Sequence, residues 1–318
     1  MKYVVTGATG HIGNTIVKYL LDANKEVRVL LRRIDSSIKG LDIEYRVGDI
    51  FNENFLAMNI ERGDVVIHLA GIIDVKNKLK EETYRINYLG TKLIADIALQ
   101  KGARKFIYFS SVDAIYKEKT NEKIKEPALM YPDKLNDYYG KSKALATEYI
   151  MNLEKRQSKM SVAIIYPSAV IGINDYKPSY IGKVICDVIK NKPEFGIDGG
   201  YDFVDVEDIA KFTLKVIDNN LSGSYILSGT RITVKQMYQA FNKALGKEKK
   251  MLKLPMWIVY LAIPFVPYLS KFTIKTLQDE SKYDSTKALN DGYKVTPFYE
   301  TVLKSVAFQK NRLEKEKK

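Results

Sequence analysis

The sequence predicts an α/β protein built on a doubly wound parallel sheet, with a smaller C-terminal lobe. At the start of the chain the apolar pattern changes from a period of 2 to a period of 3.6 and back, which is typical of a β-α-β unit. A glycine-rich turn joins this first strand to its helix, and the stretch VVIHLAG (65–71) is an apolar run typical of a buried strand. With 318 residues, 46% of them hydrophobic, the chain can form one large core or two joined lobes.

Composition excludes several classes of protein. A single cysteine, Cys186, excludes a disulfide framework, and with only two histidines, His11 and His68, no metal site is expected. The chain opens directly as a strand, so we expect no export signal and a cytoplasmic protein. The net charge of +13 would suit nucleic acid, but the lysines are spread along the chain without a nucleic-acid-binding motif. We therefore expect a small-molecule substrate and no nucleic-acid partner, and a homodimer stays open.

The first β-α-β unit carries the clearest functional signal. A strand ends at Thr6, and Gly7, Gly10 and Gly13 fall in the turn that opens the helix. Without side chains there, the backbone can turn tightly and approach a pyrophosphate, while the helix N-terminus supplies N–H donors and a positive dipole. The turn predicts a dinucleotide-binding Rossmann domain. The contacts expected from it are Thr6, Gly7, Thr9, Gly10, His11, Ile12 and Gly13.

The end of the second strand, VLLRRID, bears on the choice of cofactor. In a dinucleotide fold, an acidic residue about 20 positions past the glycines selects NAD by binding the ribose 2′-hydroxyl. Leu31 occupies that place here, and Arg32 and Arg33 follow it. Because a guanidinium can pair with a 2′-phosphate, the sequence favours NADP. NAD remains the alternative, since Asp35 is close by.

The stretch DYYGKSKALATEY (137–149) contains a candidate catalytic pair. If it is helical, Tyr139 and Lys143 are four residues apart and share a face, whereas Tyr138 and Lys143 do not. A phenol with its usual pKa near about 10 is a poor proton carrier at neutral pH, and a nearby ammonium group favours the phenolate. We therefore predict that Lys143 lowers the pKa of Tyr139. Surface lysines beside half-buried tyrosines are the alternative interpretation.

Taken together, these motifs resemble the extended branch of the short-chain dehydrogenase/reductase superfamily. The glycine spacing G-x-x-G-x-x-G after Thr6 and the Tyr-x-x-x-Lys pair carry the resemblance, which runs along most of the chain. That branch includes NAD-dependent epimerase/dehydratases and dihydroflavonol-reductase-like enzymes. The resemblance implies Ser111 as the catalytic serine, with Ser110 as the fallback, beside Tyr139 and Lys143. It also implies cofactor contacts from Asp49, Ile50, Leu69, Ala70, Gly71, Asn87, Tyr139, Lys143 and Pro167.

The implied reaction is the NAD(P)-dependent interconversion of a carbonyl and a secondary alcohol. Tyr139 would move the proton, Lys143 would assist it, and Ser111 would bind the developing oxyanion. Tyr166 and Ala169 stand where nucleotide-sugar enzymes of this kind carry arginine and asparagine, so an apolar substrate is favoured. Trp257, Tyr260 and Phe265 are expected to contribute to an apolar binding surface. Two alternatives remain, a nucleotide-sugar epimerase/dehydratase and a non-catalytic NADP-binding regulator.

The domain boundaries follow from the same pattern. The Rossmann domain is expected over 1–165, with 202–229 returning to it, and the substrate lobe over 166–201 and 230–308. Residues 309–318 are expected to be a basic, solvated tail. The apolar stretch 251–269 has three interpretations: a core helix of the small lobe, an apolar lid or a contact with a membrane surface, or a membrane anchor.

Overall fold

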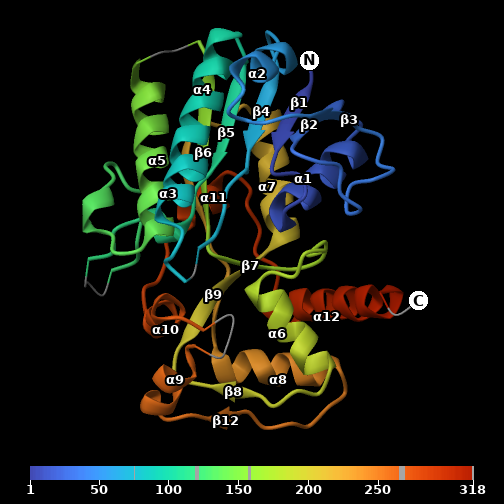
Figure 1. The fold of residues 1–318 in the computed structure, drawn as a ribbon, viewed down its shortest axis with the longest axis vertical. Helices are drawn as coiled ribbons and strands as arrows, with labels where there is room; N and C mark the ends of the chain where they lie inside the picture. Colours follow the sequence, from blue (N-terminus) through green and yellow to red (C-terminus); the bar gives the residue numbers. More distant parts are fainter. Residues whose placement is uncertain (75, 119–121, 157–158, 265–268, 317–318) are drawn as a thin grey trace.

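The computed structural model describes residues 1–74, 76–118, 122–156, 159–264 and 269–316. Over these residues the chain forms a main sheet of seven parallel strands in the order β10-β6-β5-β4-β1-β2-β3 (Figure 1). This order confirms the predicted doubly wound sheet. The strands are β1 (Tyr3–Thr6), β2 (Val27–Leu31), β3 (Glu44–Val47), β4 (Val65–His68), β5 (Lys105–Phe109), β6 (Ser161–Pro167) and β10 (Gly223–Leu227).

Helices cover both faces of the main sheet. Because side chains alternate along a strand, Val5 faces one layer and Val4 the other, and both are fully buried. One layer contains α1 (His11–Asp22), α7 (Val206–Asp218) and α11 (Thr286–Asn290). The opposite layer contains α2 (Glu53–Asn59), α4 (Thr91–Gln100) and α5 (Tyr138–Arg156).

Shorter helical segments lie between these elements. Helix α3 (Lys80–Thr83) continues into a π-helical segment, η1 (Tyr84–Gly90), which leads directly into α4. Two 3-10 turns, η2 (Val112–Ala114) and η3 (Pro132–Lys134), lie between β5 and α5. Since π-helical turns are rare and are frequent at functional sites, η1 marks a region of interest.

The small lobe lies below the carboxyl ends of the main strands in Figure 1. A second sheet contains β7 (Ala169–Ile171), β9 (Gly200–Asp205) and β11 (Thr230–Thr233). Its core is shared with α6 (Tyr180–Ile189), α8 (Val234–Ala244) and α12 (Phe298–Lys315). The outer end of the lobe is formed by β8 (Phe195–Gly196), β12 (Leu252–Lys253), α9 (Met256–Ala262) and α10 (Lys271–Gln278).

Two segments lie elsewhere than the sequence suggested. Strand β9, expected to return to the main sheet, pairs with β7 and β11 instead, and the return is made by α7 and β10. Residues 286–293, expected in the substrate lobe, pack on the main sheet through Ala288 and Tyr293, both almost fully buried. The apolar side chains on α11 and just after it therefore pack in the core of the main sheet, not in the core of the small lobe.

The expected basic tail is also different. Residues 309–315 are the end of α12, and Gln309 is 1% exposed. Its side chain donates a hydrogen bond to the backbone oxygen of Asp175 (2.9 Å), and Arg312 donates to the thiol of Cys186 (3.3 Å). The helix therefore packs against the small lobe up to Arg312, because its polar side chains find partners there.

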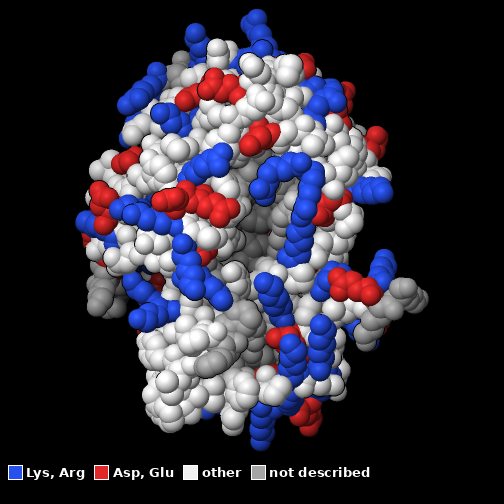
Figure 2. All heavy atoms as spheres, viewed as in Figure 1, with Lys and Arg blue, Asp and Glu red and all other residues white. Residues whose placement is uncertain are grey.

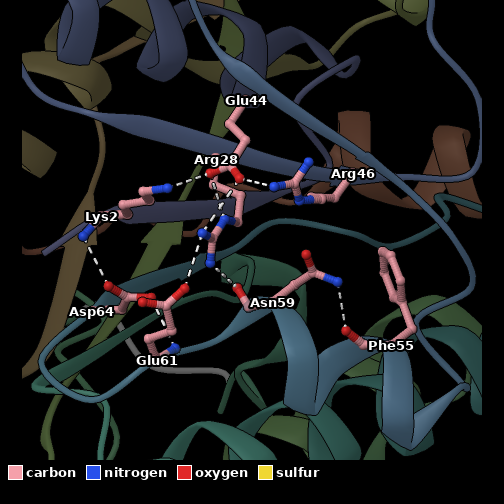
Figure 3. A network of polar contacts seen from close by, with 8 residues as sticks. All are labelled: Lys2, Arg28, Glu44, Arg46, Phe55, Asn59, Glu61 and Asp64. Atoms are coloured by element: carbon pink, nitrogen blue, oxygen red, sulfur yellow. Dashed lines mark hydrogen bonds and ion pairs between the residues drawn. The ribbon is translucent and has the colours of Figure 1, made fainter.

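A polar network ties together the amino ends of the first strands (Figure 3). Arg28, at the start of β2, is 4% exposed in its side chain and pairs with Glu44 of β3 (2.7 Å) and Glu61 (3.1 Å). Lys2 pairs with Glu44 (2.7 Å) and donates its backbone N–H to Asp64 (2.8 Å). This network lies at the end of the sheet opposite the glycine turn and fixes neighbouring strands relative to one another.

The apolar stretch 251–269 is divided between β12 and α9, and residues 265–268 lie outside the described residues. Among the described residues, no helix has both the length and the apolar character needed to cross a bilayer.

Candidate active site

A cavity of about 390 Å³ lies where the main strands end and the small lobe begins. Its wall includes the glycine turn, the ends of β4, β5 and β6, the start of α5, and parts of β9, β11 and α10. Figure 2 shows the surface hollowed between the upper and lower parts of the molecule. In open α/β sheets, ligands bind outside the carboxyl ends of the strands. The cavity is therefore the candidate active site.

The glycine turn has the geometry that a dinucleotide requires. Gly7 has φ +72°, and a Cβ there would lie 2.7 Å from the backbone of Leu69 and Ala70. A Cβ on Gly13 would lie 2.3 Å from the oxygen of Gly7. Helix α1 begins at His11 after Gly10, which has no side chain to cap the helix, so the first-turn N–H groups face the cavity. These features fit a pyrophosphate at the helix N-terminus.

Most of the predicted cofactor residues line the cavity. They are Gly7, Gly10, His11, Ile12, Gly13, Leu69, Gly71, Tyr139, Lys143 and Pro167. The imidazole of His11 is held by the backbone oxygen of Ile173 (2.8 Å). Burial lowers its pKa, and Asp175 and Asp205 partly oppose that shift. His11 therefore joins the glycine turn to the small lobe.

Other residues that were predicted as cofactor contacts are buried next to the cavity and hold its wall in place through hydrogen bonds. Thr6 is fully buried, and its hydroxyl pairs with His68 Nδ1 (2.7 Å) and accepts the N–H of Ala70 (3.2 Å). Asn87, in the π-helical segment, donates to the oxygen of Ile72 (3.0 Å) and accepts its N–H (2.8 Å). It also donates to Ser142 Oγ (3.0 Å), so it braces the chain after β4 against α5. Thr9 lies half-buried within the glycine turn.

The residues expected near the adenosine end lie beyond the cavity, along the carboxyl edge of the sheet. Arg32 and Arg33 follow β2 and are exposed. Asp49 follows β3 and is also exposed, with one carboxylate oxygen accepting the N–H of Phe51 (3.0 Å). Ile50 is half-buried next to it. The strand order puts β1, β2 and β3 side by side, so these residues continue the line that starts at the glycine turn.

The two serines after β5 have different surroundings. The hydroxyl of Ser110 pairs with Thr147 Oγ1 (2.7 Å), and both side chains are buried. The hydroxyl of Ser111 caps η2 by accepting the N–H of Asp113 (3.1 Å). Burial raises the pKa of Tyr139, and a hydrogen bond from Ser111 opposes that rise in part. Ser111 therefore lies beside Tyr139, whereas the hydroxyl of Ser110 is engaged with Thr147.

Tyr139 is placed beside Ser111 by the close packing of the first turn of α5. The next residue, Gly140, allows this, because a Cβ there would lie 2.6 Å from the oxygen of Asp113. Burial raises the pKa of Tyr139, Asp113 raises it further, and the hydrogen bond from Ser111 lowers it. The phenol is therefore protonated at neutral pH. Tyr138, in contrast, does not line the cavity within the described structure.

Lys143 lies one turn further along α5 and is 6% exposed. Its Nζ donates to the backbone oxygen of Phe109 (2.8 Å) and lies 5.1 Å from the centre of the Tyr108 ring. Gly71 lies beside this Nζ, and a Cβ there would lie 3.0 Å from Asn87 Oδ1 and in ordinary contact, at 3.5 Å, with the Lys143 Nζ. Burial lowers the pKa of Lys143 to about 8. The expected lowering of the Tyr139 pKa by Lys143 is not found: burial and Asp113 raise that pKa, and the opposing contribution comes from Ser111.

A charged cluster beside Tyr139 was not predicted. Asp113 faces the cavity, and burial raises its pKa while Lys117 and Ser111 partly lower it. Lys117 pairs with Asp279 at the end of α10 (2.5 Å). The signal in the sequence was Asp113 itself, two residues after Ser111. The pair next to it, Lys117 and Asp279, is 162 residues apart in the chain and meets only in the folded protein.

The apolar wall of the cavity also differs from expectation. Trp257 and Tyr260 are 65% and 49% exposed and do not line it within the described structure, and Phe265 lies outside the described residues. Tyr166 is fully buried in the main core. The side chains that form the apolar wall include Leu69, Ile72, Ile73, Phe109, Val112, Tyr180, Ile181, Tyr201, Phe272 and Tyr283.

Comparisons with known proteins agree with this geometry. The model of the family described as "NAD dependent epimerase/dehydratase family" matches residues 3–227. The chain is 25% identical over 295 residues to the sterol demethylase protein B of Methylococcus capsulatus, covering 92% of this chain and 89% of that protein. It is 26% identical over 306 residues to a putative dihydroflavonol 4-reductase of Synechocystis, covering 91% and 88%.

Among solved structures, the fold is similar to that of the UDP-glucose 4-epimerase of Thermus thermophilus in complex with NAD. The TM-score is 0.80 at 20% identity, with 98% of this chain and 99% of that chain covered. At this identity the likeness concerns the fold alone.

Proposed function

This chain belongs to the NAD-dependent epimerase/dehydratase family and is an NAD(P)-dependent enzyme of the short-chain dehydrogenase/reductase type; on that premise we propose that it interconverts a carbonyl and a secondary alcohol on a substrate with a large apolar part. The observation that carries the proposal is the meeting of Ser111 and Tyr139 at the cavity wall, with Lys143 buried one turn behind. The names of two relatives, a sterol demethylase protein and a putative dihydroflavonol 4-reductase, point in the same direction.

The proposed roles follow from the positions of the side chains. When bound, a nicotinamide cofactor would supply or accept the hydride. Tyr139, protonated at neutral pH because burial raises its pKa, donates the proton to the carbonyl oxygen during reduction. Ser111 donates a hydrogen bond to the same oxygen as charge develops there. Lys143, a cation below pH about 8, binds the ribose and stabilises the phenolate after the proton has left.

The charges of the cavity support a substrate that is not a polyanion. Among the described lining residues of its substrate half, Asp113, Asp202 and Asp279 are acidic, while Lys117 and Arg231 are cationic. Lys117 is paired with Asp279 (2.5 Å). Burial raises the pKa of Asp202, and Arg231 lies close enough to oppose that rise in part. A nucleotide sugar brings two phosphate charges, which this nearly balanced set would not neutralise.

For the cofactor we propose NADP, with NAD as the alternative. Arg32 and Arg33 are exposed beside the glycine turn, where a 2′-phosphate could pair with them. Asp35, the residue that could serve NAD, pairs with Lys177 (2.9 Å). Burial tends to raise the pKa of Asp35, but hydrogen bonds from Lys177 and Ser37 lower it to about 2. Its carboxylate is thus already engaged in contacts within the protein.

A second candidate function is epimerisation or dehydration of a nucleotide sugar. The observation in its favour is Asp113, a second acid-base group beside Tyr139. Such a group has no assigned role in simple carbonyl reduction, and a carboxyl with a raised pKa suits general acid catalysis.

The test is a substrate screen with the purified protein. NADPH and NADH oxidation are followed against panels of hydrophobic ketones, hydrophobic aldehydes and UDP- or dTDP-sugars. We expect NADPH oxidation with one of the hydrophobic carbonyl compounds and no change in the sugars. Saturable binding of a nucleotide sugar by calorimetry, with turnover of the sugar, would reject the proposal in favour of the epimerase/dehydratase.

A further inference from the structure

The outer end of the small lobe carries an apolar surface that no described part of the chain covers. Helix α9 places Trp257, Tyr260 and Leu261 at positions i, i+3 and i+4, so they share one face. They are 65%, 49% and 66% exposed. The opposite side of the helix is already packed, since Val259 is 4% exposed and contacts Ile197 and Ile274. Helix α9 is therefore apolar on both sides, with one side facing outward.

In the segment that carries α9, basic residues outnumber acidic residues. Residues 247–282 contain seven lysines and three acidic residues. Lys249 and Lys253 pair with Glu194 (3.8 Å) and Asp198 (2.6 Å) from outside this range, and Asp279 pairs with Lys117 inside the cavity. Lys271 and Lys275, on the neighbouring helix α10, are exposed. Figure 2 shows the lower left of the molecule, over α9 and α10, nearly without charged side chains, and Lys and Arg side chains at its borders. The whole chain carries a net charge of +13.

We propose that the apolar face of α9 docks on an anionic membrane surface. Tryptophan and tyrosine prefer the boundary between lipid headgroups and acyl chains, and basic residues around an apolar helix face attract anionic lipids. A protein partner would need a matching acidic apolar groove, whereas a bilayer of anionic lipid supplies both chemistries. Membrane contact was one of three interpretations of residues 251–269, and the orientation of α9 favours it over a core helix.

The docking face is one helix away from the active site. Ile274 of α10 packs on Val259 of α9, while Phe272, Thr273 and Thr276 of α10 line the cavity. A substrate dissolved in the bilayer would therefore reach the cavity along α10. This connection to substrate entry rests on the proposed function, whereas docking itself does not.

The protein contains its own probe, because Trp257 is its only tryptophan. The fluorescence of Trp257 is excited selectively, and its emission spectrum is recorded in a titration with vesicles. One set of vesicles contains phosphatidylcholine alone, and the other also contains phosphatidylglycerol. We expect a blue shift and protection from acrylamide with the anionic vesicles, reversed by high salt. Unchanged emission with both vesicles would overturn the proposal. An equal response to both would overturn the role of charge, and concentration-dependent protection without vesicles would show a contact between copies of the chain.

Variants separate the docking face from the fold. Tyr260→Ser with Leu261→Ser should lower the affinity for anionic vesicles at least tenfold, and Lys271→Glu with Lys275→Glu should lower it several-fold. Met58→Ser on α2 is the control, because Met58 is also an exposed apolar side chain (72%) but belongs to the Rossmann domain and not to the small lobe. Titration with NADPH reports whether each variant is folded. Vesicle binding that survives both double substitutions would contradict the proposal, whatever the outcome of the substrate screen.

Discussion

Replacing Lys143 with methionine should stabilise the protein while it removes activity. The ammonium group of Lys143 is 6% exposed, and burial lowers its pKa from 10.5 to about 8. At about 1.4 kcal/mol per pKa unit, the buried charge lowers the unfolding free energy by roughly 3 kcal/mol at neutral pH. Methionine has a similar shape but forfeits the hydrogen bond to Phe109, which contributes about 1 kcal/mol. The expected net gain in unfolding free energy is about 2 kcal/mol at pH 7.

The pH dependence gives this prediction its sign. Between pH 8 and 10.5 the unfolded wild-type chain binds a proton at Lys143 that the folded chain has lost, so this group makes the wild type more stable as pH rises. The advantage of Lys143→Met should therefore shrink to near zero by pH 10. Urea unfolding at pH 7 and pH 10 measures this advantage. The control on the same helix is Lys141→Met, because the Lys141 side chain is 41% exposed and pairs with the exposed Asp133. A variant less stable than the wild type at pH 7, or a difference independent of pH, would refute the reasoning.

Two further substitutions test the cofactor site. Changing both Arg32 and Arg33 to alanine should weaken NADPH binding by about 2–4 kcal/mol and leave NADH binding nearly unchanged. Equal losses of affinity for the two cofactors in calorimetry would show that these arginines do not bind the 2′-phosphate. Gly13→Ala should abolish binding of either cofactor and lower the melting temperature, because its Cβ would lie 2.3 Å from the oxygen of Gly7. Normal cofactor affinity in that variant would contradict the claim that the turn leaves no room for a side chain at this position.

Much of the Rossmann domain could be predicted from local pattern. The glycine turn, the strand ends and the helix that carries Tyr139 and Lys143 follow one another within short stretches whose spacing is fixed by strand and helix geometry. For the two serines that follow β5, the resemblance to the family favoured Ser111 and kept Ser110 as the fallback. Only the folded chain shows that Ser110 is engaged with Thr147 while Ser111 contacts Tyr139.

The small lobe was less predictable because its contacts join distant segments. The pairing of Lys117 with Asp279 depends on the fold, and no local sequence pattern predicts it. Trp257 and Tyr260 were expected to contribute to an apolar binding surface for substrate, since apolar residues are more often inside than outside. On a helix as short as α9, apolar on both sides, composition alone does not say which side is packed.

The most direct test of the proposed chemistry compares Tyr139→Phe with Tyr138→Phe, using NADPH and a carbonyl compound that the wild type reduces. The first change removes only the transferable proton, so turnover should fall by at least a thousandfold while the dissociation constant for NADPH stays within about threefold. The second change should leave turnover nearly intact, because Tyr138 does not line the cavity within the described structure. If Tyr139→Phe retains most of the wild-type rate, Tyr139 does not carry the proton and the proposed mechanism is wrong.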